Sequence, residues 1–401
     1  MNFIHVTRAL RYGLWWSAVM LDGFLSANRN EEKVAPYTLP DPLQVSQETR
    51  MSDSEMWENK RRTLLDLFSE HLYGAIPESS PEINFKLDTS VSALNGIASK
   101  KEITLFLTSD TKGPNAHLVL FTPSGKGPYP VILGYNLEGN HTVLRDASIS
   151  RYAVWSKKIS GCSFIPSEGT RGKREERWPV EDILSRGYAL ATLYYGDVEP
   201  DYPNASSGIR AVFPEFQKQE DNFSAIGAWA WGLSRVMDYL STNADIDATR
   251  VSLFGFSRVG KAVLLAAARD RRFAGVIAVS SGKGGAALSR RTFGETLRAM
   301  TTKYPHWFSK KFASYAGREN ELPVDQHELL ALIAPRPVLV SSADKDWWSD
   351  PTGEKEAVDA ARKVYALYKK ENNLKHVLHH GKHEVTRDKW NDYFAFLGKN
   401  L

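Results

Sequence analysis

The sequence predicts an α/β fold, in which a mainly parallel sheet is covered by helices on both faces. Short apolar runs of the kind that form buried strands alternate along the chain with longer stretches of helical periodicity. Of the 401 residues, 42% are hydrophobic and 24% are charged, which is an ordinary composition for a globular protein with a large core. No internal repeat or low-complexity tract interrupts the alternation, so residues 35–401 are expected to form one elaborated domain.

The first half of the chain is expected to begin with a helix over residues 54–72, which Gly74 ends. Residues 146–180 are irregular and charged, so we expect a long surface insertion. A helix with many apolar residues is expected over residues 222–240. Short β runs and a loop with glycine and asparagine complete this half: strands at residues 103–107, 117–121, 128–136 and 187–195, and the loop at residues 137–141.

A small basic run lies inside the predicted insertion. It consists of Arg171, Lys173, Arg174 and Arg177. A solvated face explains such a run better than substrate contact does.

The second half continues the alternation of strands and helices up to the C-terminus. A glycine-rich loop and an acidic loop interrupt it, at residues 282–285 and 344–350. The expected strands are residues 251–254, 276–279, 337–342 and 375–378, and the expected helices are residues 261–268, 355–369 and 387–397.

A serine occupies the turn between a buried strand and a helix, in the run Gly-Phe-Ser-Arg-Val-Gly at residues 255–260. This arrangement is typical of the nucleophile elbow of an α/β-hydrolase, although Val259 stands where the pattern Gly-x-Ser-x-Gly has its second glycine. The turn would lift the Ser257 hydroxyl clear of the sheet. It would also place the next amide at a helix N-terminus, where an oxyanion is stabilised. The alternative interpretation is that Ser257 caps the helix.

A general base is expected after the last strand, because α/β-hydrolases carry their triad in the order serine, acid, histidine. Three histidines lie there. His383 follows a glycine on a loop and is the favoured base, whereas His379 and His380 are expected at the strand end.

The acid is expected after the preceding strand, where three aspartates compete. Asp346 lies a few residues beyond the strand end and is favoured, while Asp344 and Asp350 could instead cap turns. In this interpretation Ser257 attacks an acyl carbonyl, His383 transfers the proton, and Asp346 holds the imidazole tautomer.

Other chemistries find little support in the sequence. The three C-terminal histidines do not form the His-Glu-x-x-His zinc pattern, and residues 282–285 lack the spacing of a P-loop. The net charge of +4 is too small to indicate a nucleic-acid partner. We therefore expect no metal, no organic cofactor and no nucleic acid, and we expect a monomer.

Residues 1–34 are expected to form a signal or a flexible segment. Basic residues precede an apolar run that Asp22 interrupts, and the run is too short to span a bilayer. Cys162 is the only cysteine, so no intrachain disulfide can form. The lone cysteine neither requires nor excludes export, whereas the N-terminal segment favours a secreted or periplasmic protein without a membrane span in its mature form.

Several further motifs resemble those of the glucuronoyl esterases of carbohydrate esterase family 15, in particular its bacterial members. The resemblance covers roughly residue 37 to the C-terminus. It is carried by residues 177–179, 194–197, 228–232, 255–261, 281–291, 293–296, 305–308, 322–327, 334–337, 348–351 and 381–383.

The resemblance implies a serine esterase that cleaves the ester between the 4-O-methyl-glucuronate of xylan and lignin alcohols. It implies that Arg258, beside the nucleophile, helps to hold the oxyanion. It also implies that Lys261, Glu295 and Trp348 contact the uronate ring. The implied partner is glucuronoxylan or a lignin–carbohydrate ester.

Two residues depart from the pattern of the family. Many members place the acid where this chain has Ser280, so the implied acid is the later one, Asp346. Lys283 in the glycine-rich loop is unusual and could change the local charge. A carbohydrate deacetylase such as an acetyl xylan esterase, or a carbohydrate-binding homologue without activity, is therefore the alternative function.

Overall fold

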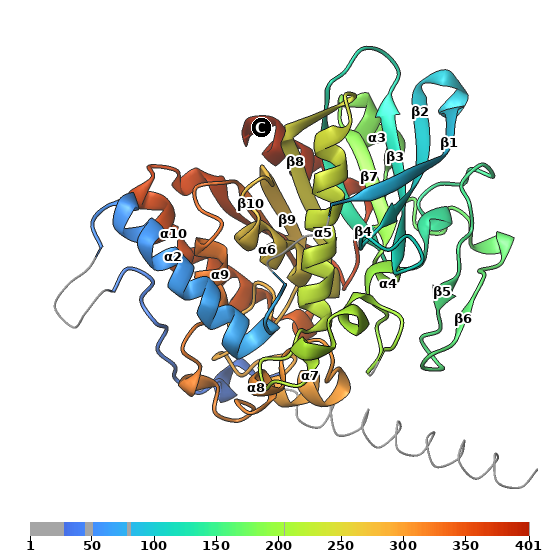
Figure 1. The fold of residues 1–401 in the computed structure, drawn as a ribbon. Coiled ribbons are helices and arrows are strands. Elements are labelled where there is room, and N and C mark those ends of the chain that lie inside the picture. The colour runs from blue at the N-terminus through green and yellow to red at the C-terminus, as the bar shows by residue number, and fades with distance from the viewer. Residues whose placement is uncertain (1–27, 45–50, 78–81, 204, 401) are drawn as a thin grey trace, which may run out of the picture.

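The computed structural model describes residues 28–44, 51–77, 82–203 and 205–400, which surround one large sheet (Figure 1). Nine strands run in the order β1-β2-β3-β7-β4-β8-β9-β10-β11. The pairs from β7 to β11 are parallel, and only the edge formed by β1, β2, β3 and β7 pairs antiparallel. The mainly parallel sheet expected from the sequence is confirmed. Its strands are β1 (Asn84–Ala93), β2 (Ala98–Phe106), β3 (Asn115–Pro123), β4 (Tyr129–Asn136), β7 (Ala189–Tyr194), β8 (Ile246–Phe256), β9 (Gly275–Val279), β10 (Val338–Ala343) and β11 (Leu374–His379).

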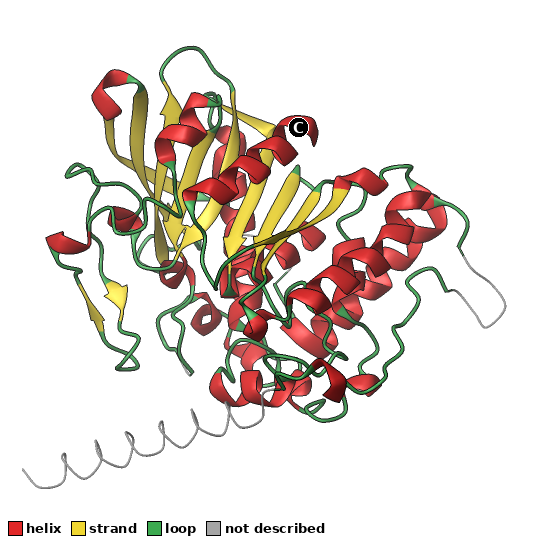
Figure 2. Cartoon of the chain, turned by 180° about the vertical axis from the view of Figure 1, so that it is seen from behind, coloured by secondary structure: helices red, strands yellow, loops and turns green. Residues whose placement is uncertain are grey.

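Helices cover both faces because alternate strand residues point to opposite sides of the sheet. In β4, Val131 and Leu133 pack into the larger core, while Ile132 packs into the smaller one. Figures 1 and 2 show the two helical layers from opposite sides. The larger core holds α2 (Ser54–Phe68), α5 (Ala225–Thr242), α6 (Arg258–Arg269), α9 (Gln326–Ala331) and α10 (Pro351–Leu367), and the smaller holds α3 (Val180–Ser185) and α11 (Trp390–Asn400).

The predicted helices and strands are present, with shifted ends. The first helix ends in a π-helical turn, Ser69–Tyr73, and Gly74 then adopts a positive φ of 80°. Strand β8 begins earlier than predicted, at Ile246. The next residues, Asp247 to Arg250, are mostly polar and lie outside the core, so they lack the apolar pattern of a buried strand. Besides α9, the described residues between β7 and β10 form three short α-helices: α4 (Tyr195–Val198), α7 (Leu297–Lys303) and α8 (Lys310–Ala313).

The insertion over residues 146–180 contains one small hairpin, β5 (Val154–Trp155) with β6 (Ser163–Phe164). The expectation that its basic run forms a solvated face is wrong for Arg171 and Arg177, whose side chains face inward. Arg171 donates to the backbone oxygens of Asp146 and Ile149, at 2.7 and 2.8 Å, and Arg174 binds Glu138.

Arg177 also faces inward, and its guanidinium lies 4.5 Å from the centre of the Phe256 ring. Guanidinium groups carry five donors, so they can tie an irregular segment to the body of the protein. The run therefore anchors the insertion next to the end of β8.

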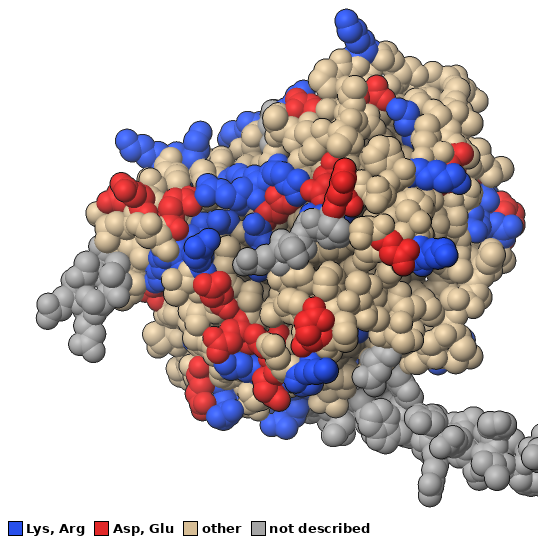
Figure 3. Space-filling model, viewed as in Figure 1, with Lys and Arg blue, Asp and Glu red and all other residues tan. Residues whose placement is uncertain are grey.

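Basic and acidic side chains lie side by side on the face shown in Figure 3. Arg271 pairs with Glu58, and Arg272 pairs with Asp238 and Asp270. These two arginines are thus paired locally with carboxylates.

The predicted signal region lies largely outside the described residues, since the description begins at Asn28. From there the chain contacts the rest of the protein: Gly294 N donates to Asn28 O at 2.9 Å, and Arg29 covers the ring of Trp347 at 3.9 Å. Among the helices of the described segments, none combines the length and apolar character that crossing a bilayer requires.

Candidate active site

The turn after β8 holds Ser257 in a strained backbone conformation, with φ of 60° and ψ of −129°. Two backbone hydrogen bonds fix it, from Ser257 N to Val279 O at 2.9 Å and from Gly260 N to Ser257 O at 2.8 Å. A Cβ on residue 255 would lie 2.5 Å from Val259 O, so only glycine permits this sharp turn. Such strain is a feature of functional sites.

The Ser257 hydroxyl does not cap the helix that it precedes, because its side chain makes no capping hydrogen bond to the first turn of α6. It lies instead 2.9 Å from Nε2 of His383. The capping interpretation is therefore wrong, and the hydroxyl is in reach of a base.

His383 joins the serine to a carboxylate. Its Nδ1 lies 2.6 Å from Oδ2 of Asp346, and its ring packs on Phe256 at 4.7 Å between ring centres. When Nδ1 donates to Asp346, Nε2 is free to accept the proton of Ser257. The three residues favoured from the sequence thus form a continuous chain of hydrogen bonds.

Asp346 is buried, with 4% of its surface exposed, and it also accepts a hydrogen bond from Ser349 Oγ at 2.7 Å. Burial acts to raise the pKa of this carboxyl. The hydrogen bond and charge of His383, together with the hydroxyl of Ser349, outweigh burial and hold the pKa below its ordinary value. Asp346 is therefore ionised at neutral pH.

The competing histidines contact other partners. His380 is exposed and lies 2.8 Å from Asp344, which also accepts from Gly381 N at 2.9 Å. Nδ1 of His379 lies 3.9 Å from Asp392. Asp344 and His380 thus form a pair at the surface and do not contact Ser257.

Asp350 is fully buried and serves α10 and the glycine-rich loop. It accepts from Gly353 N at 3.0 Å as the helix cap, and it pairs with Arg291 at 3.0 Å and with Lys283 at 3.3 Å. Lys283 also donates to the backbone oxygens of Leu288 and Arg291, so its ammonium has three hydrogen-bond partners in the protein. The unusual lysine is thus a structural residue.

Arg258 is held beside Ser257 by Asp201, which the sequence analysis missed. The guanidinium pairs with Oδ2 of Asp201, while Oδ1 accepts from His306 Nε2 at 2.9 Å and from Trp307 Nε1 at 2.7 Å. Burial opposes ionisation of Asp201, but the charge of Arg258 and these hydrogen bonds together lower its pKa below the ordinary value. Arg258 is therefore a fixed positive charge next to the serine.

Lys261 is buried, and its Nζ donates to the backbone oxygens of Ser281 and Lys283, both at 2.6 Å. Burial lowers the pKa of Lys261 to about 8, against the opposing effect of Glu295. The ring of Trp307 lies 5.8 Å from this ammonium.

The two other predicted contact residues are joined through the backbone, since Glu295 N donates to Trp348 O at 3.0 Å. The ring of Trp348 meets that of Trp347 edge-on at 5.4 Å. The charge of Glu295 also acts on Lys261, which lies on α6 directly after the serine turn. Lys261, Glu295 and Trp348 are therefore close to Ser257.

Glu354 is a second buried carboxyl that the sequence analysis missed. It accepts from Ser281 Oγ at 3.0 Å and from Gly282 N at 2.9 Å. Burial raises the pKa of Glu354 to about 7. It orders the loop whose backbone oxygens hold Lys261.

This geometry is suited to ester cleavage by a serine. A hydroxyl, an imidazole and an ionised carboxylate lie in sequence, with a fixed cation beside the hydroxyl. In the part of the chain that the structure describes, no group of three or more potential metal ligands comes together.

Comparison with known proteins agrees with this chemistry. A model of the family "Glucuronyl esterase, fungi" matches residues 180–368. Carbohydrate esterase MZ0003, from an unknown prokaryotic organism, is 39% identical over 93% of this chain and 92% of its own.

Solved structures extend the likeness. The glucuronoyl esterase of Solibacter usitatus superposes with a TM-score of 0.88 at 37% identity, covering 92% of this chain and 100% of that one. A promiscuous esterase of carbohydrate esterase family 15 from a marine bacterial metagenome has a TM-score of 0.85 at 38% identity, covering 94% and 100%.

The fold and these relatives define a carboxylic ester hydrolase of the α/β-hydrolase fold. More narrowly, the chain belongs to the glucuronoyl esterase family, carbohydrate esterase family 15.

Proposed function

We propose that this protein hydrolyses esters of 4-O-methyl-glucuronate through an acyl-enzyme formed on Ser257. Relatives named 4-O-methyl-glucuronoyl methylesterase, such as that of Wolfiporia cocos at 26% identity over 82% of this chain, support the uronate ester as substrate. The observation that carries the proposal is the continuous chain of hydrogen bonds from Ser257 through His383 to Asp346.

In the first half of the reaction Ser257 Oγ attacks the ester carbonyl, and its proton passes to Nε2 of His383. The tetrahedral intermediate collapses, and the alcohol leaves with that proton. Water then attacks the acyl-enzyme with His383 as base, which releases the uronic acid and restores the serine. Asp346 stabilises the imidazolium in both halves.

Positive charge beside the serine supports the same reaction. The amide of Arg258 opens α6, and its side chain is held in place by Asp201, so both can stabilise the oxyanion. Lys261 and Glu295 would bind hydroxyls of the uronate ring, and Trp348 would cover its apolar face. The natural substrate would then be glucuronoxylan esterified to lignin alcohols, attacked by an exported monomer.

Hydrolysis of benzyl glucuronate by the natural protein and by Ser257→Ala tests this proposal. We expect turnover by the natural protein and none above background by the variant. Equal turnover by both would contradict the assignment of the nucleophile.

Acetylated xylan distinguishes the deacetylase from the uronate esterase. Hydrolysis of acetyl groups with no action on benzyl glucuronate would replace the proposed substrate. Sugar binding without hydrolysis of either ester would instead indicate a binding protein.

A further inference from the structure

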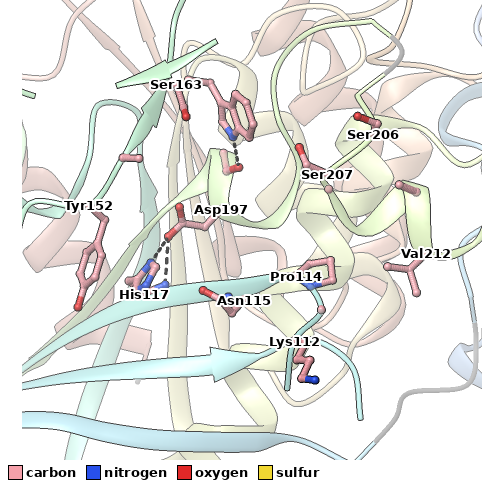
Figure 4. Close-up of a pocket in the computed structure, with 16 residues that line it drawn as sticks. Lys112, Pro114, Asn115, His117, Tyr152, Ser163, Asp197, Ser206, Ser207 and Val212 are labelled. Atoms are coloured by element: carbon pink, nitrogen blue, oxygen red, sulfur yellow. Dashed lines mark hydrogen bonds and ion pairs between the residues drawn. The ribbon is translucent and has the colours of Figure 1, made fainter. Parts of the chain in front are cut away.

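A pocket lies at the same end of the sheet as Ser257, the end where the parallel strands β7 and β8 finish. Its volume is about 690 Å³, and it is lined by the start of β3, the residues after β7, the hairpin β5–β6 and residues 206–212 (Figure 4). Strands β7, β4 and β8 are neighbours, and neighbouring strands lie about 4.8 Å apart. The end of β7 is therefore roughly 10 Å across the sheet from the end of β8, where Ser257 lies.

Trp155 connects this pocket with the active site. Its Nε1 donates to Gly196 O at 2.9 Å, and its ring meets that of Tyr202 edge-on at 5.5 Å. Tyr202 directly follows Asp201, the partner of Arg258. Trp155 and Tyr202 thus link the pocket to the residue that holds Arg258.

Three planar polar side chains in the pocket have unused hydrogen-bonding positions. Oδ2 of Asp197 accepts from His117 N at 3.0 Å and lies 3.1 Å from its Nδ1. Within the described segments, Oδ1 of Asp197, Nε2 of His117 and the carboxamide of Asn115 make no hydrogen bond to the protein. Figure 4 shows these three residues together. They offer donors and acceptors to a ligand with many hydroxyls.

Aromatic surface accompanies these polar groups. The ring of Tyr152 stacks on that of His117, with 3.5 Å between ring centres and an angle of 15°. Trp155 contributes a second ring to the lining. Lys112 and Asp197 are the charged residues of the lining and have opposite signs, so the pocket favours a neutral ligand.

We propose that this pocket binds neutral pyranose rings of the oligosaccharide that carries the esterified uronate. The identity of that oligosaccharide rests on the proposed function, whereas the sugar chemistry follows from the lining. The volume is that of a small-molecule binding pocket. An aromatic alcohol suits it less well, because it would remove water from Asp197 and Asn115 without replacing the lost hydrogen bonds.

Calorimetric titration of the full chain with β-1,4-xylotetraose and with cellotetraose tests the inference. We expect binding of at least one of them to the natural protein. Tyr152→Leu removes the stacking ring and Asn115→Ala removes a carboxamide, and we expect each to weaken binding about tenfold. Phe164→Leu is the matched control, because Phe164 lies on β6 outside the pocket and is 53% exposed. Thermal unfolding of each variant shows that it is folded.

The outcomes separate the pocket from the active site. Absence of binding at millimolar oligosaccharide would overturn the inference. So would binding that only Phe164→Leu weakens, or displacement of the sugar by benzyl alcohol. Benzyl glucuronate carries no sugar chain, so its hydrolysis in the same preparation tests the proposed function independently.

Discussion

Replacing Asp346 by asparagine is the sharpest test of the chain of hydrogen bonds that links Ser257, His383 and Asp346. Oδ2 of Asp346 accepts from both His383 Nδ1, at 2.6 Å, and Ser349 Oγ, at 2.7 Å. In the variant, an amide oxygen in the place of Oδ2 would keep both bonds but not the charge that stabilises the imidazolium, whereas an NH₂ group in that place would face His383. That NH₂ donates to Nδ1, so the imidazole carries its proton on Nε2 and cannot accept one from Ser257.

The expected loss in kcat is about 10⁴-fold, as for the corresponding change in serine proteases. This corresponds to about 5.4 kcal/mol of transition-state stabilisation. KM for benzyl glucuronate should change little, since Asp346 is buried and contacts His383 and Ser349. Steady-state kinetics gives both constants, and thermal unfolding shows whether the variant is folded.

Asp344→Asn is the matched control, because Asp344 lies in the same loop and pairs with the exposed His380. Its effect on kcat should stay within about twofold, as for most surface changes. A variant of Asp346 that kept more than about a tenth of kcat would refute the assignment. A large loss in Asp344→Asn would refute it as well.

Three further predictions concern the residues around the serine. Asp201→Asn removes the charge that holds Arg258, so kcat should fall roughly tenfold to hundredfold, measured with benzyl glucuronate; an unchanged kcat would show that Arg258 needs no anchor. The pKa of Lys261 is lowered to about 8, so its ammonium loses its proton as pH rises through that value. If it binds the uronate, kcat/KM should decline above about pH 8, and Lys261→Met should be poorly active and lack this decline. Glu354 has its pKa raised to about 7 from 4.5, so its stabilising effect is complete below about pH 4.5 and is lost as pH rises through 7. Glu354→Gln stays neutral, so its Tm should fall less between pH 5 and pH 8 than that of the natural protein; parallel curves would exclude Glu354 as the titrating group.

The serine turn was predictable because its signal is local. A strand, a glycine and a helix within a few residues specify the elbow, and the structure adds only the strained φ at Ser257. The alternation of strands and helices likewise specified the mainly parallel sheet. His383 could be singled out because it lies on a loop just after Gly381, whereas the strand-end histidines pair with Asp344 and Asp392.

The buried carboxylates that hold the active-site residues in place could not be predicted, because each contacts a residue far away in the chain. Asp201 reaches Arg258 across 57 positions, and Glu354 reaches Ser281 across 73. Neither carboxylate belongs to a pattern with its partner, so only the packing of the folded chain brings them together. Arg171 shows the converse: its sequence context is that of a solvated run, and its backbone acceptors could not be foreseen.

Ser280 offers a test of whether the acid can be moved within this fold. Ser280 follows β9, is 2% exposed and has a positive φ of 45°, a region that aspartate tolerates better than most residues. Its hydroxyl lies near enough to Asp346 to help lower the pKa of that carboxyl. A carboxylate at position 280 should therefore reach His383.

Adding Ser280→Asp to Asp346→Asn should recover at least tenfold in kcat, whereas Ser280→Asn in the same background should recover nothing. Ser280→Asp alone should bring two buried carboxylates together and lower Tm at pH 8, because their repulsion opposes ionisation of both. No recovery in the double variant would mean that position 280 cannot serve His383 in this chain, and that the site depends on Asp346 alone.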